Sequence, residues 1–255
     1  MEILICGYGN IGRHIYNELE IENGLFTNLF IFDKYKENFN NISILQKHYD
    51  FAFICVPTDN NENGICDTSI VFTMVDQIDA DIIIIKSAVP VGTCEVLNRK
   101  KNIVCSPEYW GTTVHSNQTP NFLILGGSRS HTSKVAELYS KFKPGSYRFI
   151  FTDFRTAELA KYMDNCFIAT KVTFCNEFAQ IAKKFNVNYE ELRECFVADK
   201  RVSPSHTFVY PDKPYYDSHC LNKDIPALIH HCDQYGIDTP LIDAVNKVNL
   251  DAKNK

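Results

Sequence analysis

Two polar side chains lie four residues apart in the longest apolar-patterned stretch of the sequence. Lys161 and Asn165 are near the start of residues 154–185, where apolar residues recur at intervals of three, four and seven. That spacing is typical of one helix face, and residues four apart on a helix share a face. The sequence therefore predicts a long helix that holds an ammonium group beside a side-chain amide, a pair of donors suited to stabilising an oxyanion.

A glycine-rich turn near the start of the chain has the spacing of a dinucleotide-binding fingerprint. It follows an apolar run over residues 2–6 and precedes a helical pattern, which is the strand–turn–helix context that the fingerprint requires. The first glycine permits the tight turn, the second lets a pyrophosphate approach the backbone, and the third lets helix and strand pack closely. The predicted cofactor-binding turn consists of Gly7, Tyr8, Gly9, Asn10, Ile11 and Gly12.

An acidic residue at the end of the second predicted strand favours NAD over NADP. The apolar run over residues 29–32 ends at Asp33, about 20 residues after the glycines, where a carboxylate accepts hydrogen bonds from the adenosine ribose. The same negative charge repels a 2′-phosphate. We therefore expect NAD as the cofactor.

Further apolar runs predict the rest of a sheet and the edge at which ligands bind. The runs over residues 51–56, 81–85, 103–105, 122–125 and 147–152 do not alternate with polar residues. Such strands, separated by helical patterns, indicate a parallel sheet covered on both faces, with ligands beyond the carboxyl ends of the strands. The residues expected at those ends are Val56, Pro57, Thr58, Ser87, Ala88 and Glu108.

The predicted fold class is α/β, with a Rossmann-type doubly wound parallel sheet over residues 1–153 and a mainly helical domain over residues 154–255. In the second domain, residues 189–197 read as a short helix, and a loop rich in proline and aromatic residues then delivers Cys220. A helical pattern resumes at Ile225. Thr239 and Pro240 predict a last helix that begins with a side-chain cap and a proline in its first turn.

Composition excludes several classes of partner. The chain has 255 residues, a net charge of −5 and 45% hydrophobic residues, which predicts a real core and no general attraction to nucleic acid or anionic lipid. We see no signal peptide and no apolar run near the ~20 residues of a membrane span. The ten cysteines never form a CxxC pair. We therefore expect reduced thiols in the cytoplasm, with no metal site and no disulfide framework.

The chain resembles the UDP-glucose/GDP-mannose dehydrogenase family through a set of motifs that covers nearly all of its length. The motifs occur in that family's order: GYGNIG, CVPT, KSAVPVGT, SPE, AELAKYMDN, DKR, HCLNKD and TPLIDAVNKVN. The resemblance implies a dehydrogenase that oxidises the C6 alcohol of a nucleotide sugar to a carboxylate with two NAD. It also implies that Cys220 captures the intermediate aldehyde, while Lys161 and Asn165 stabilise oxyanions.

The same resemblance implies roles for four further residues. Asp224 would orient water and protons, Glu108 would act as acid or base in thioester hydrolysis, and Arg201 and Lys223 would contact substrate. The chemistry is consistent, because an aldehyde can lose a hydride only after a nucleophile has added to it, and a thiolate is a good nucleophile.

Three features depart from the family pattern. Ala88 stands where the family usually has threonine, Thr112 where it has a second glutamate, and residues 215–218 replace a glycine-rich turn before the cysteine. The family's third domain, which grips the nucleotide, also has no counterpart in this sequence. We therefore expect slow thioester hydrolysis and weak substrate binding, and we consider a separate nucleotide-binding chain as a partner.

Two other functions stay open at this stage. A two-electron hydroxyacid dehydrogenase shares the glycine-rich domain, the long helix and the Lys-x-x-x-Asn pair, and it needs neither Cys220 nor a third domain. A non-catalytic subunit that binds NAD and dimerises is also consistent with the departures. In each case we expect a homodimer built on the helix over residues 154–185, whose apolar face is too wide and long to be covered within one chain.

Overall fold

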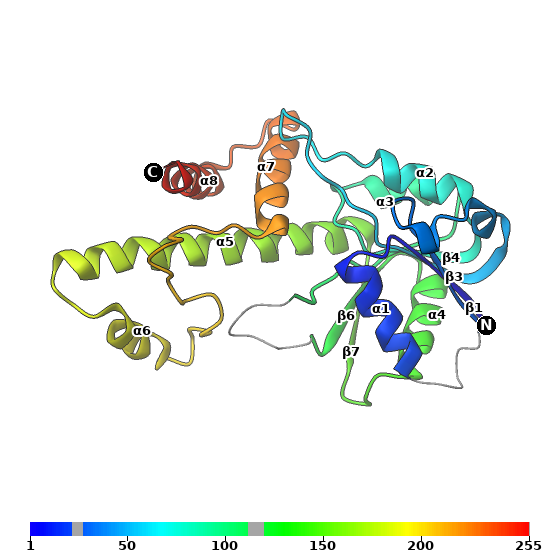
Figure 1. Cartoon of the computed structure of the whole chain (residues 1–255), viewed down its shortest axis with the longest axis horizontal. Helices are drawn as coiled ribbons and strands as arrows, with labels where there is room; N and C mark the ends of the chain where they lie inside the picture. Colours follow the sequence, from blue (N-terminus) through cyan, green and yellow to red (C-terminus); the bar gives the residue numbers. More distant parts are fainter. Residues whose placement is uncertain (22–27, 112–119, 255) are drawn as a thin grey trace. The chain divides into compact units, whose positions relative to one another are not determined.

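The structure is a computed structural model that describes residues 1–21, 28–111 and 120–254 (Figure 1). The strands are β1 (Glu2–Cys6), β2 (Asn28–Phe32), β3 (His48–Ile54), β4 (Asp79–Ile85), β5 (Ile103–Cys105), β6 (Phe122–Gly126) and β7 (Arg148–Thr152). The α-helices are α1 (Asn10–Ile21), α2 (Ser69–Gln77), α3 (Thr93–Leu97), α4 (Arg129–Ser140), α5 (Phe154–Lys184), α6 (Tyr189–Val197), α7 (His219–Gln234) and α8 (Pro240–Lys253). Two short 3₁₀ helices, Glu37–Phe39 and Ile42–Gln46, lie between β2 and β3.

The chain divides into two compact units, and the division falls inside α5, between Lys161 and Tyr162. The first unit, here called the nucleotide-binding unit, holds the sheet with α1 to α4 and the start of α5. The second, here called the helical unit, holds the rest of α5 with α6, α7 and α8, and the loop segment 62–65 is grouped with it.

The sheet of the nucleotide-binding unit has the order β2-β1-β3-β4-β5-β6-β7. The expected doubly wound α/β fold is confirmed, because the chain winds from β1 to β2 in one direction and from β3 onward in the other. Such a reversal opens a crevice at the carboxyl ends of β1 and β3, where this class of sheet binds its ligands.

One strand pair differs from the prediction of a fully parallel sheet. β5 and β6 run antiparallel, with Cys105 opposite Gly126, while all the other neighbours in the sheet are parallel. Parallel neighbours need a crossover connection, usually a helix, whereas antiparallel neighbours do not. The described residues between β5 and β6 contain no helix, which accounts for the reversal.

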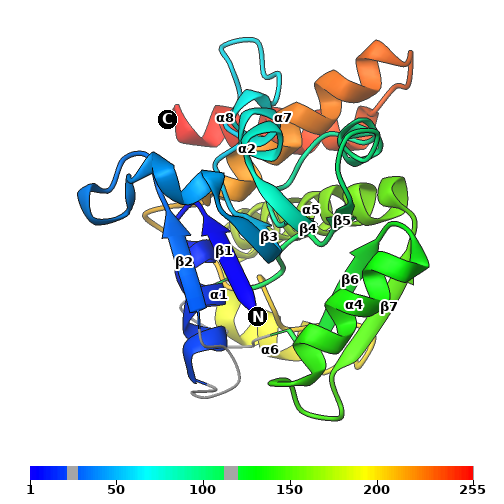
Figure 2. The ribbon, with the colours of Figure 1, turned by 90° about the vertical axis from the view of Figure 1, so that its right-hand side faces the viewer.

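Both faces of the sheet are buried, as the unalternating apolar runs predicted. On one face Ile83 and Ile85 of β4 pack with α2, α3 and Ala157 of α5. On the other face Ile82 and Ile84 pack with α1 and α4 (Figure 2). Alternate residues of this strand therefore serve two separate cores, which explains why the four positions 82–85 are all isoleucine.

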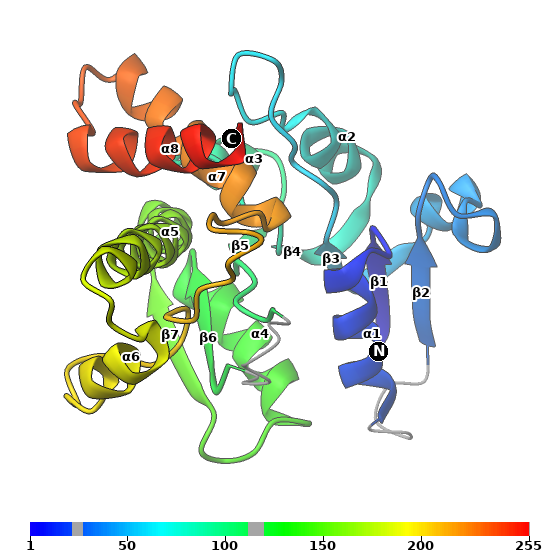
Figure 3. The same cartoon turned by 60° about the vertical axis from the view of Figure 1, so that its left-hand side comes forward.

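The helical unit packs α7 and α8 on one side of α5 and α6 on the other (Figure 3). Its buried cluster joins Cys166 and Ala169 of α5 with Leu221 and Ile225 of α7 and Val245 of α8. The last helix begins at Pro240 as predicted, but the expected side-chain cap is wrong. The Thr239 hydroxyl donates to the carboxylate of Asp243 at 3.1 Å instead of accepting from the backbone.

The apolar residues of α5 form two faces and not the single wide stripe that the sequence predicted. The buried face uses small residues, among them Ala157, Ala169 and Ala182. The larger side chains lie on an exposed face, with Met163 at 74% and Phe167 at 67% exposure. This exposed face, here called the α5 aromatic face, comprises Met163, Phe167, Phe174, Phe178, Ile181 and Phe185.

In the part of the chain that the structure describes, no helix is both long enough and apolar enough to span a bilayer. All ten cysteines are free thiols, as predicted from their scatter. Most are buried or half-buried, and Cys195 and Cys220 are exposed.

Candidate active site

The glycine turn after β1 is packed on two sides and open on the third. Gly7 has φ +87°, and a Cβ built there would lie 2.6 Å from the Cys55 carbonyl oxygen. A Cβ on Gly12 would lie 1.9 Å from the Gly7 carbonyl oxygen, whereas a Cβ on Gly9 meets nothing within 4 Å. The open position at Gly9 is where the backbone and the first amides of α1, at Asn10 and Ile11, would meet a pyrophosphate. The turn therefore fits the predicted dinucleotide.

Asp33 lies beside this turn and is held by backbone amides. Its Oδ2 accepts from the Tyr8 amide at 2.8 Å, and its Oδ1 accepts from the Tyr35 amide at 3.0 Å. A carboxylate has about four acceptor positions, so both oxygens can still accept from ribose hydroxyl groups. The structure thus brings Asp33 to the turn, as the NAD prediction requires.

Hydrogen bonds join the loops that follow β3 and β4. The Thr58 hydroxyl donates to the Ala88 carbonyl oxygen at 2.8 Å, and the Ser87 hydroxyl donates to the Val56 carbonyl oxygen at 2.6 Å. Pro57 is exposed between Val56 and Thr58. These five residues were predicted to bind the cofactor, and the structure places them together at the carboxyl edge of the sheet.

Glu108 follows β5 and forms an ion pair that the sequence reasoning did not identify. Its Oε2 lies 3.0 Å from Nζ of Lys86, and its Oε1 accepts from the amides of Tyr109 at 2.9 Å and Trp110 at 2.7 Å. Burial raises the pKa of Glu108, but the charge of Lys86 and the amide of Trp110 outweigh it, so the pKa lies below its ordinary value. The only sequence signal was a lysine directly after four isoleucines.

A second buried glutamate fixes the loop that follows β4. Glu158, near the start of α5, is 1% exposed, and its two oxygens accept from the amides of Gly92 at 2.6 Å and Cys94 at 2.7 Å. Gly92 has φ +95° and precedes α3. Glu158 therefore ties this loop to α5. Sequence analysis missed it because one acid on a long amphipathic helix gives no sign that it is buried.

Cys220 is the second residue of α7, which corrects the prediction that it lies in a loop. The helix begins at His219, six residues before the predicted start, and the Ser218 hydroxyl oxygen caps it by accepting from the Leu221 amide at 3.3 Å. Pro226 explains the error, because proline usually breaks a helical pattern. The Cys220 thiol is exposed in the first turn of α7, where helix amides favour nearby negative charge.

Asp224 lies one turn after Cys220, on the same face of α7. It is 1% exposed, and its oxygens accept from the side-chain amide of Asn165 at 2.6 Å and from Nζ of Lys223 at 2.6 Å. Three residues predicted from the sequence are therefore in direct contact in the helical unit. Their contact also directs the Cys220 face of α7 to the face of α5 that carries Asn165.

Lys161 lies one turn before Asn165 on α5 and is half-buried. In the nucleotide-binding unit its ammonium lies 4.5 Å from the centre of the Tyr109 ring. That separation is within the range of a cation–π interaction. Tyr109 is adjacent to Glu108, so Lys161 contacts the segment that follows β5.

The turn before Cys220, which replaces the family's glycines, is anchored to α8. Tyr216 is buried, and its amide donates to the side chain of Asn249 at 2.8 Å. Asp217 pairs with Lys213 at 2.7 Å and with Lys253 at 2.8 Å. Hydrogen bonds from Lys213 and then Lys253 hold the pKa of Asp217 below its ordinary range. The side chains in this turn therefore hold it in place.

Two residues from the sequence analysis are not part of these groups. Arg201 follows α6, its side chain is 90% exposed, and its guanidinium lies 2.6 Å from the carboxylate of Asp199. The structure therefore does not bring Arg201 to the Asn165–Asp224 pair. Thr112 lies outside the described residues.

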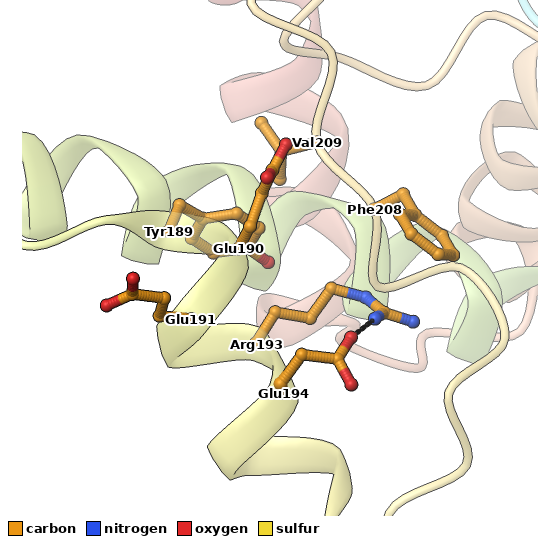
Figure 4. A pocket seen from close by; sticks show the side chains of 7 residues that line it. All are labelled: Tyr189, Glu190, Glu191, Arg193, Glu194, Phe208 and Val209. Carbon is orange, nitrogen blue, oxygen red and sulfur yellow. Dashed lines mark hydrogen bonds and ion pairs between the residues drawn. The ribbon is translucent and has the colours of Figure 1, made fainter.

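A hollow of about 540 Å³ in the helical unit contains none of the predicted site residues. It lies between α6 and residues 208–209, and Figure 4 shows Arg193 between Glu194 and Phe208. Arg193 is buried, its guanidinium carbon is 3.7 Å from the centre of the Phe208 ring, and it pairs with Glu194. With its cation paired in this way, the hollow carries no group of the predicted chemistry.

Comparison with known proteins identifies the family of this chain, which combines a doubly wound sheet unit with a helical unit. Residues 21–143 match the NAD binding domain of the UDP-glucose/GDP-mannose dehydrogenase family, and residues 155–251 match the central domain of the same family. The chain belongs to the UDP-glucose/GDP-mannose dehydrogenase family. The matched NAD binding domain indicates NAD as the cofactor.

Individual relatives support the family and extend the comparison of the fold. UDP-glucose 6-dehydrogenase of Pseudomonas aeruginosa is 32% identical over 225 residues, which are 80% of this chain and 49% of that protein. A UDP-D-ManNAc dehydrogenase from Pyrococcus horikoshii matches with a TM-score of 0.81 at 21% identity, over 99% of this chain and 69% of that chain. The chain spans about half the length of the curated relatives it matches.

A hydroxyacid dehydrogenase shares the fold over its whole length. The 3-hydroxyisobutyrate dehydrogenase of Mycobacterium tuberculosis matches with a TM-score of 0.73 at 15% identity, over 98% of this chain and 94% of that chain. At that identity the likeness concerns the fold alone. The two-unit architecture is therefore common to both classes of dehydrogenase considered above, and only the site residues separate them.

Proposed function

We propose that this chain is an NAD-dependent dehydrogenase that oxidises the primary alcohol of a nucleotide sugar to a carboxylate through a covalent adduct on Cys220. One observation carries the proposal. Cys220 is exposed in the first turn of α7, one turn before a buried Asp224 that is hydrogen-bonded to Asn165. A two-electron hydroxyacid dehydrogenase has no need of a thiol there.

The residues of the chain supply binding, a nucleophile and oxyanion donors. NAD, held at the turn from Gly7 to Gly12 with its ribose at Asp33, supplies the hydride acceptor. The Cys220 sulfur adds to the aldehyde carbon and gives a thiohemiacetal, whose oxidation gives a thioester that water then hydrolyses. The helix amides around Cys220 favour the negative charge that develops during addition.

Asn165 is suited to stabilise that charge because Asp224 fixes its amide. An amide nitrogen carries two hydrogens, and the bond to Asp224 uses one of them. We assign the second hydrogen, together with the ammonium of Lys161 one turn earlier, to the oxyanion of each tetrahedral adduct. Loss of one such donor typically lowers the rate by about 10²- to 10³-fold.

Hydrolysis of the thioester is the step that we expect to be slow. Ala88 supplies only its backbone carbonyl, which accepts from Thr58, and brings no hydroxyl of its own to the edge of the sheet. Loss of one positioned proton-transfer group typically costs about 10²- to 10⁴-fold. Glu108 is the carboxylate to which we assign the remaining general-base role.

Intact-mass spectrometry tests the adduct directly. The chain is incubated with NAD and a panel of nucleotide sugars, and we expect a mass increase equal to the oxidised sugar nucleotide on Cys220. Cys220→Ala should lose the adduct and the second NADH. Cys195→Ala is the matched control, because Cys195 is the other exposed thiol, and it should behave as wild type.

The outcomes separate the competing functions. One NADH per substrate in wild type, unchanged in Cys220→Ala and without an adduct, indicates a two-electron dehydrogenase. NAD binding without an adduct or NADH, for any nucleotide sugar, indicates a non-catalytic subunit and overturns the proposal.

Cofactor binding has its own matched pair of variants. Gly9→Ala places a methyl group in the open space where a pyrophosphate would approach, so it should fold normally and lose NAD binding by isothermal calorimetry. Asn17→Ala, at an exposed position later on α1, should retain both the fold and NAD binding. Equal binding of NAD and NADP by wild type would contradict the role assigned to Asp33.

We further propose that the chain forms a homodimer through the α5 aromatic face. The ring centres of Phe174 and Phe178 lie 4.6 Å apart, with the rings tilted by 39°, and the ring centre of Phe174 lies 6.2 Å from that of Phe196 of α6. Met163 and Phe167 are more exposed than either Phe174 or Phe178. An exposed apolar patch of this kind typically marks an interaction site.

Phe167→Glu should give a monomer by light scattering. Glu177→Ala, at an exposed position on α5, should leave the dimer intact. A wild-type monomer at micromolar concentration would contradict the proposal.

A further inference from the structure

Glu108 is held at both carboxylate oxygens, and Lys86 supplies the contact that carries charge. Lys86 directly follows β4 and is 3% exposed, and its Nζ lies 3.0 Å from Oε2 of Glu108. The other oxygen accepts from the amides of Tyr109 and Trp110 at 2.9 and 2.7 Å. With both oxygens anchored, the carboxylate has a fixed rotation and a fixed charge partner.

Stability alone gives no reason for an ammonium group at this position. Removing a lysine from water is costly, and a well-packed apolar pair of similar volume is often as stable as a buried ion pair, or more stable. Lys86 follows four isoleucines, and its side chain is 1% exposed. An apolar side chain at such a buried position would need no charge partner. The pair is therefore better explained by what it does to Glu108.

Several other groups that can carry charge face Glu108 from the elements around it. A hollow of about 10 Å³ is lined by Glu108 with His14 and Glu18 of α1, Tyr139 of α4, Lys143 and Tyr147. The carboxylate of Glu18 forms an ion pair with Lys143, and its Oε1 lies 3.3 Å from Nε2 of His14. The thiol of Cys55 also interacts electrostatically with Glu108. The hollow is about the size that one water molecule needs. Among these groups Lys86 is the one in direct ionic contact with Glu108.

We propose that Lys86 is a positioning residue that keeps Glu108 ionised and oriented to take a proton from the water that hydrolyses the Cys220 thioester. This role rests on the function proposed above. The water oxygen bonds to the thioester carbonyl carbon, its proton passes to Glu108, and the carbon–sulfur bond breaks to release the Cys220 thiolate. The proton on Glu108 then returns to the thiolate or to solvent, so that the step yields a carboxylic acid and a free thiol with no change of oxidation state.

Removal of Lys86 is expected to raise the pKa of Glu108. Burial on its own raises the pKa of Glu108, and Lys86 is the main group that reverses this effect. An opposite charge at this distance typically lowers a carboxyl pKa by about 1 to 3 units. Without the ammonium we expect Glu108 to titrate about 1 to 3 pH units higher, which leaves it protonated over part of the working range.

The first experiment reads the ionisation of Glu108 without any substrate. Glutamate side chains are labelled with ¹³C and titrated by NMR, and Glu108→Gln identifies the Glu108 signal. We expect the signal of wild type to titrate below that of an ordinary glutamate and the signal of Lys86→Met to titrate above it. Lys86→Gln serves if Lys86→Met does not fold. Lys100→Met is the matched control, because Lys100 forms an exposed pair with Asp76 at 3.1 Å, and it should leave the titration unchanged.

The second experiment reads the hydrolysis step. With substrate and NAD supplied, Lys86→Met should accumulate the Cys220 thioester, because the adduct still forms and then persists. At pH 5 its hydrolysis should be slower than in wild type, about tenfold where Glu108 of the variant titrates about one unit above that pH, and the difference should shrink towards pH 8. Lys86→Arg keeps the positive charge and should restore the wild-type pH profile. A role limited to packing would change the rate without moving the profile.

Each outcome decides a separate point. An identical Glu108 titration in wild type and Lys86→Met overturns the inference. A thioester that turns over equally fast in both proteins at every pH overturns the role of Lys86 and leaves the proposed function intact. If wild type forms no adduct with any nucleotide sugar, the proposed function fails, and the catalytic role of Lys86 fails with it.

Discussion

Two glutamates of the nucleotide-binding unit, Glu158 at 1% exposure and Glu108 with a side chain 16% exposed, show how one residue type acquires different properties in one fold. Glu108, after β5, and Glu158, near the start of α5, each accept hydrogen bonds from two backbone amides. Glu108 also contacts the ammonium of Lys86. The pKa of Glu108 is lowered, whereas burial raises the pKa of Glu158 above its ordinary value despite the Cys94 and Gly92 amides.

The difference indicates that the two backbone amides do not fully offset the effect of burial on the pKa of Glu158. Amides satisfy the acceptors of Glu158, so the side chain can act as a structural link to the loop before α3. At Glu108 the charge of Lys86 lowers the pKa against the effect of burial. The general-base role proposed for Glu108 therefore depends on a charge partner that Glu158, which ties a loop, does not have in the described contacts.

The largest expected effect on stability comes from Lys86→Met. It leaves the Glu108 carboxylate buried without its cation, which typically costs about 3–5 kcal/mol. We expect urea unfolding at pH 7 to show a loss of this size. The double variant with Glu108→Gln should recover most of it, because no charge is then buried. Lys100→Met, which removes an exposed lysine, should change the unfolding free energy by less than about 1 kcal/mol. If the double variant is no more stable than Lys86→Met, the loss arises from packing.

A smaller effect is expected for Glu158→Ala, which leaves the amides of Gly92 and Cys94 without their acceptor. Each unsatisfied buried amide costs about 1–3 kcal/mol, so we expect a loss of about 2–4 kcal/mol. Glu95→Ala, which breaks the exposed pair with Arg155, should cost less than about 1 kcal/mol. Equal losses for Glu95→Ala and Glu158→Ala in urea unfolding would show that Glu158 is not the link to the loop.

The fold of the nucleotide-binding unit was predicted well because its signals are local. Each strand is a run of apolar residues, and the turn from Gly7 to Gly12 requires glycine for reasons that a single segment contains. The predicted cofactor residues lie together because parallel strands end at one edge. The antiparallel β5–β6 pair was missed, since pairing direction depends on the connection between strands and not on the composition of either one.

In the helical unit the sequence predicted the residues of the site better than their structural setting. Asp224 contacts both Asn165 and Lys223, and all three had been assigned to the site from the family resemblance, which did not predict these contacts. Cys220 was placed in a loop because Pro226 obscured a helix that begins at His219. The two faces of α5 were merged because a list of apolar positions does not show which of them the rest of the chain covers.

The contacts that could not be predicted from the sequence are polar and join residues that are far apart in the chain. Lys86, Glu158 and Asn249 each satisfy a group far away in the chain, and none of them belongs to a local pattern. Burial of such side chains becomes visible only when the elements are assembled. All three hold a segment next to a predicted site residue, so they are features of the site as well as of the fold.

The smallest expected effect is a pair of opposite pH dependences, and it tests the comparison of the two glutamates most directly. Glu108 has a lowered pKa in the folded state, so the unfolded chain binds more protons between that value and the ordinary one of about 4.3. The stability that ionised Glu108 contributes is therefore present above that range and is lost as the pH falls. Glu158 has a raised pKa, so the folded state binds more protons, and its contribution to stability is present at low pH and is lost as the pH rises above about 4.3.

We measure unfolding free energies from pH 3.5 to 7 for wild type, Glu108→Gln and Glu158→Gln. Taking the difference of each variant from wild type cancels the contributions of the other titrating groups. The wild-type advantage over Glu108→Gln should grow with pH, and that over Glu158→Gln should shrink, each by about 1.4 kcal/mol for every unit of pKa shift. Slopes of the same sign would show that both glutamates respond to burial alone and that Lys86 does not set the charge of Glu108.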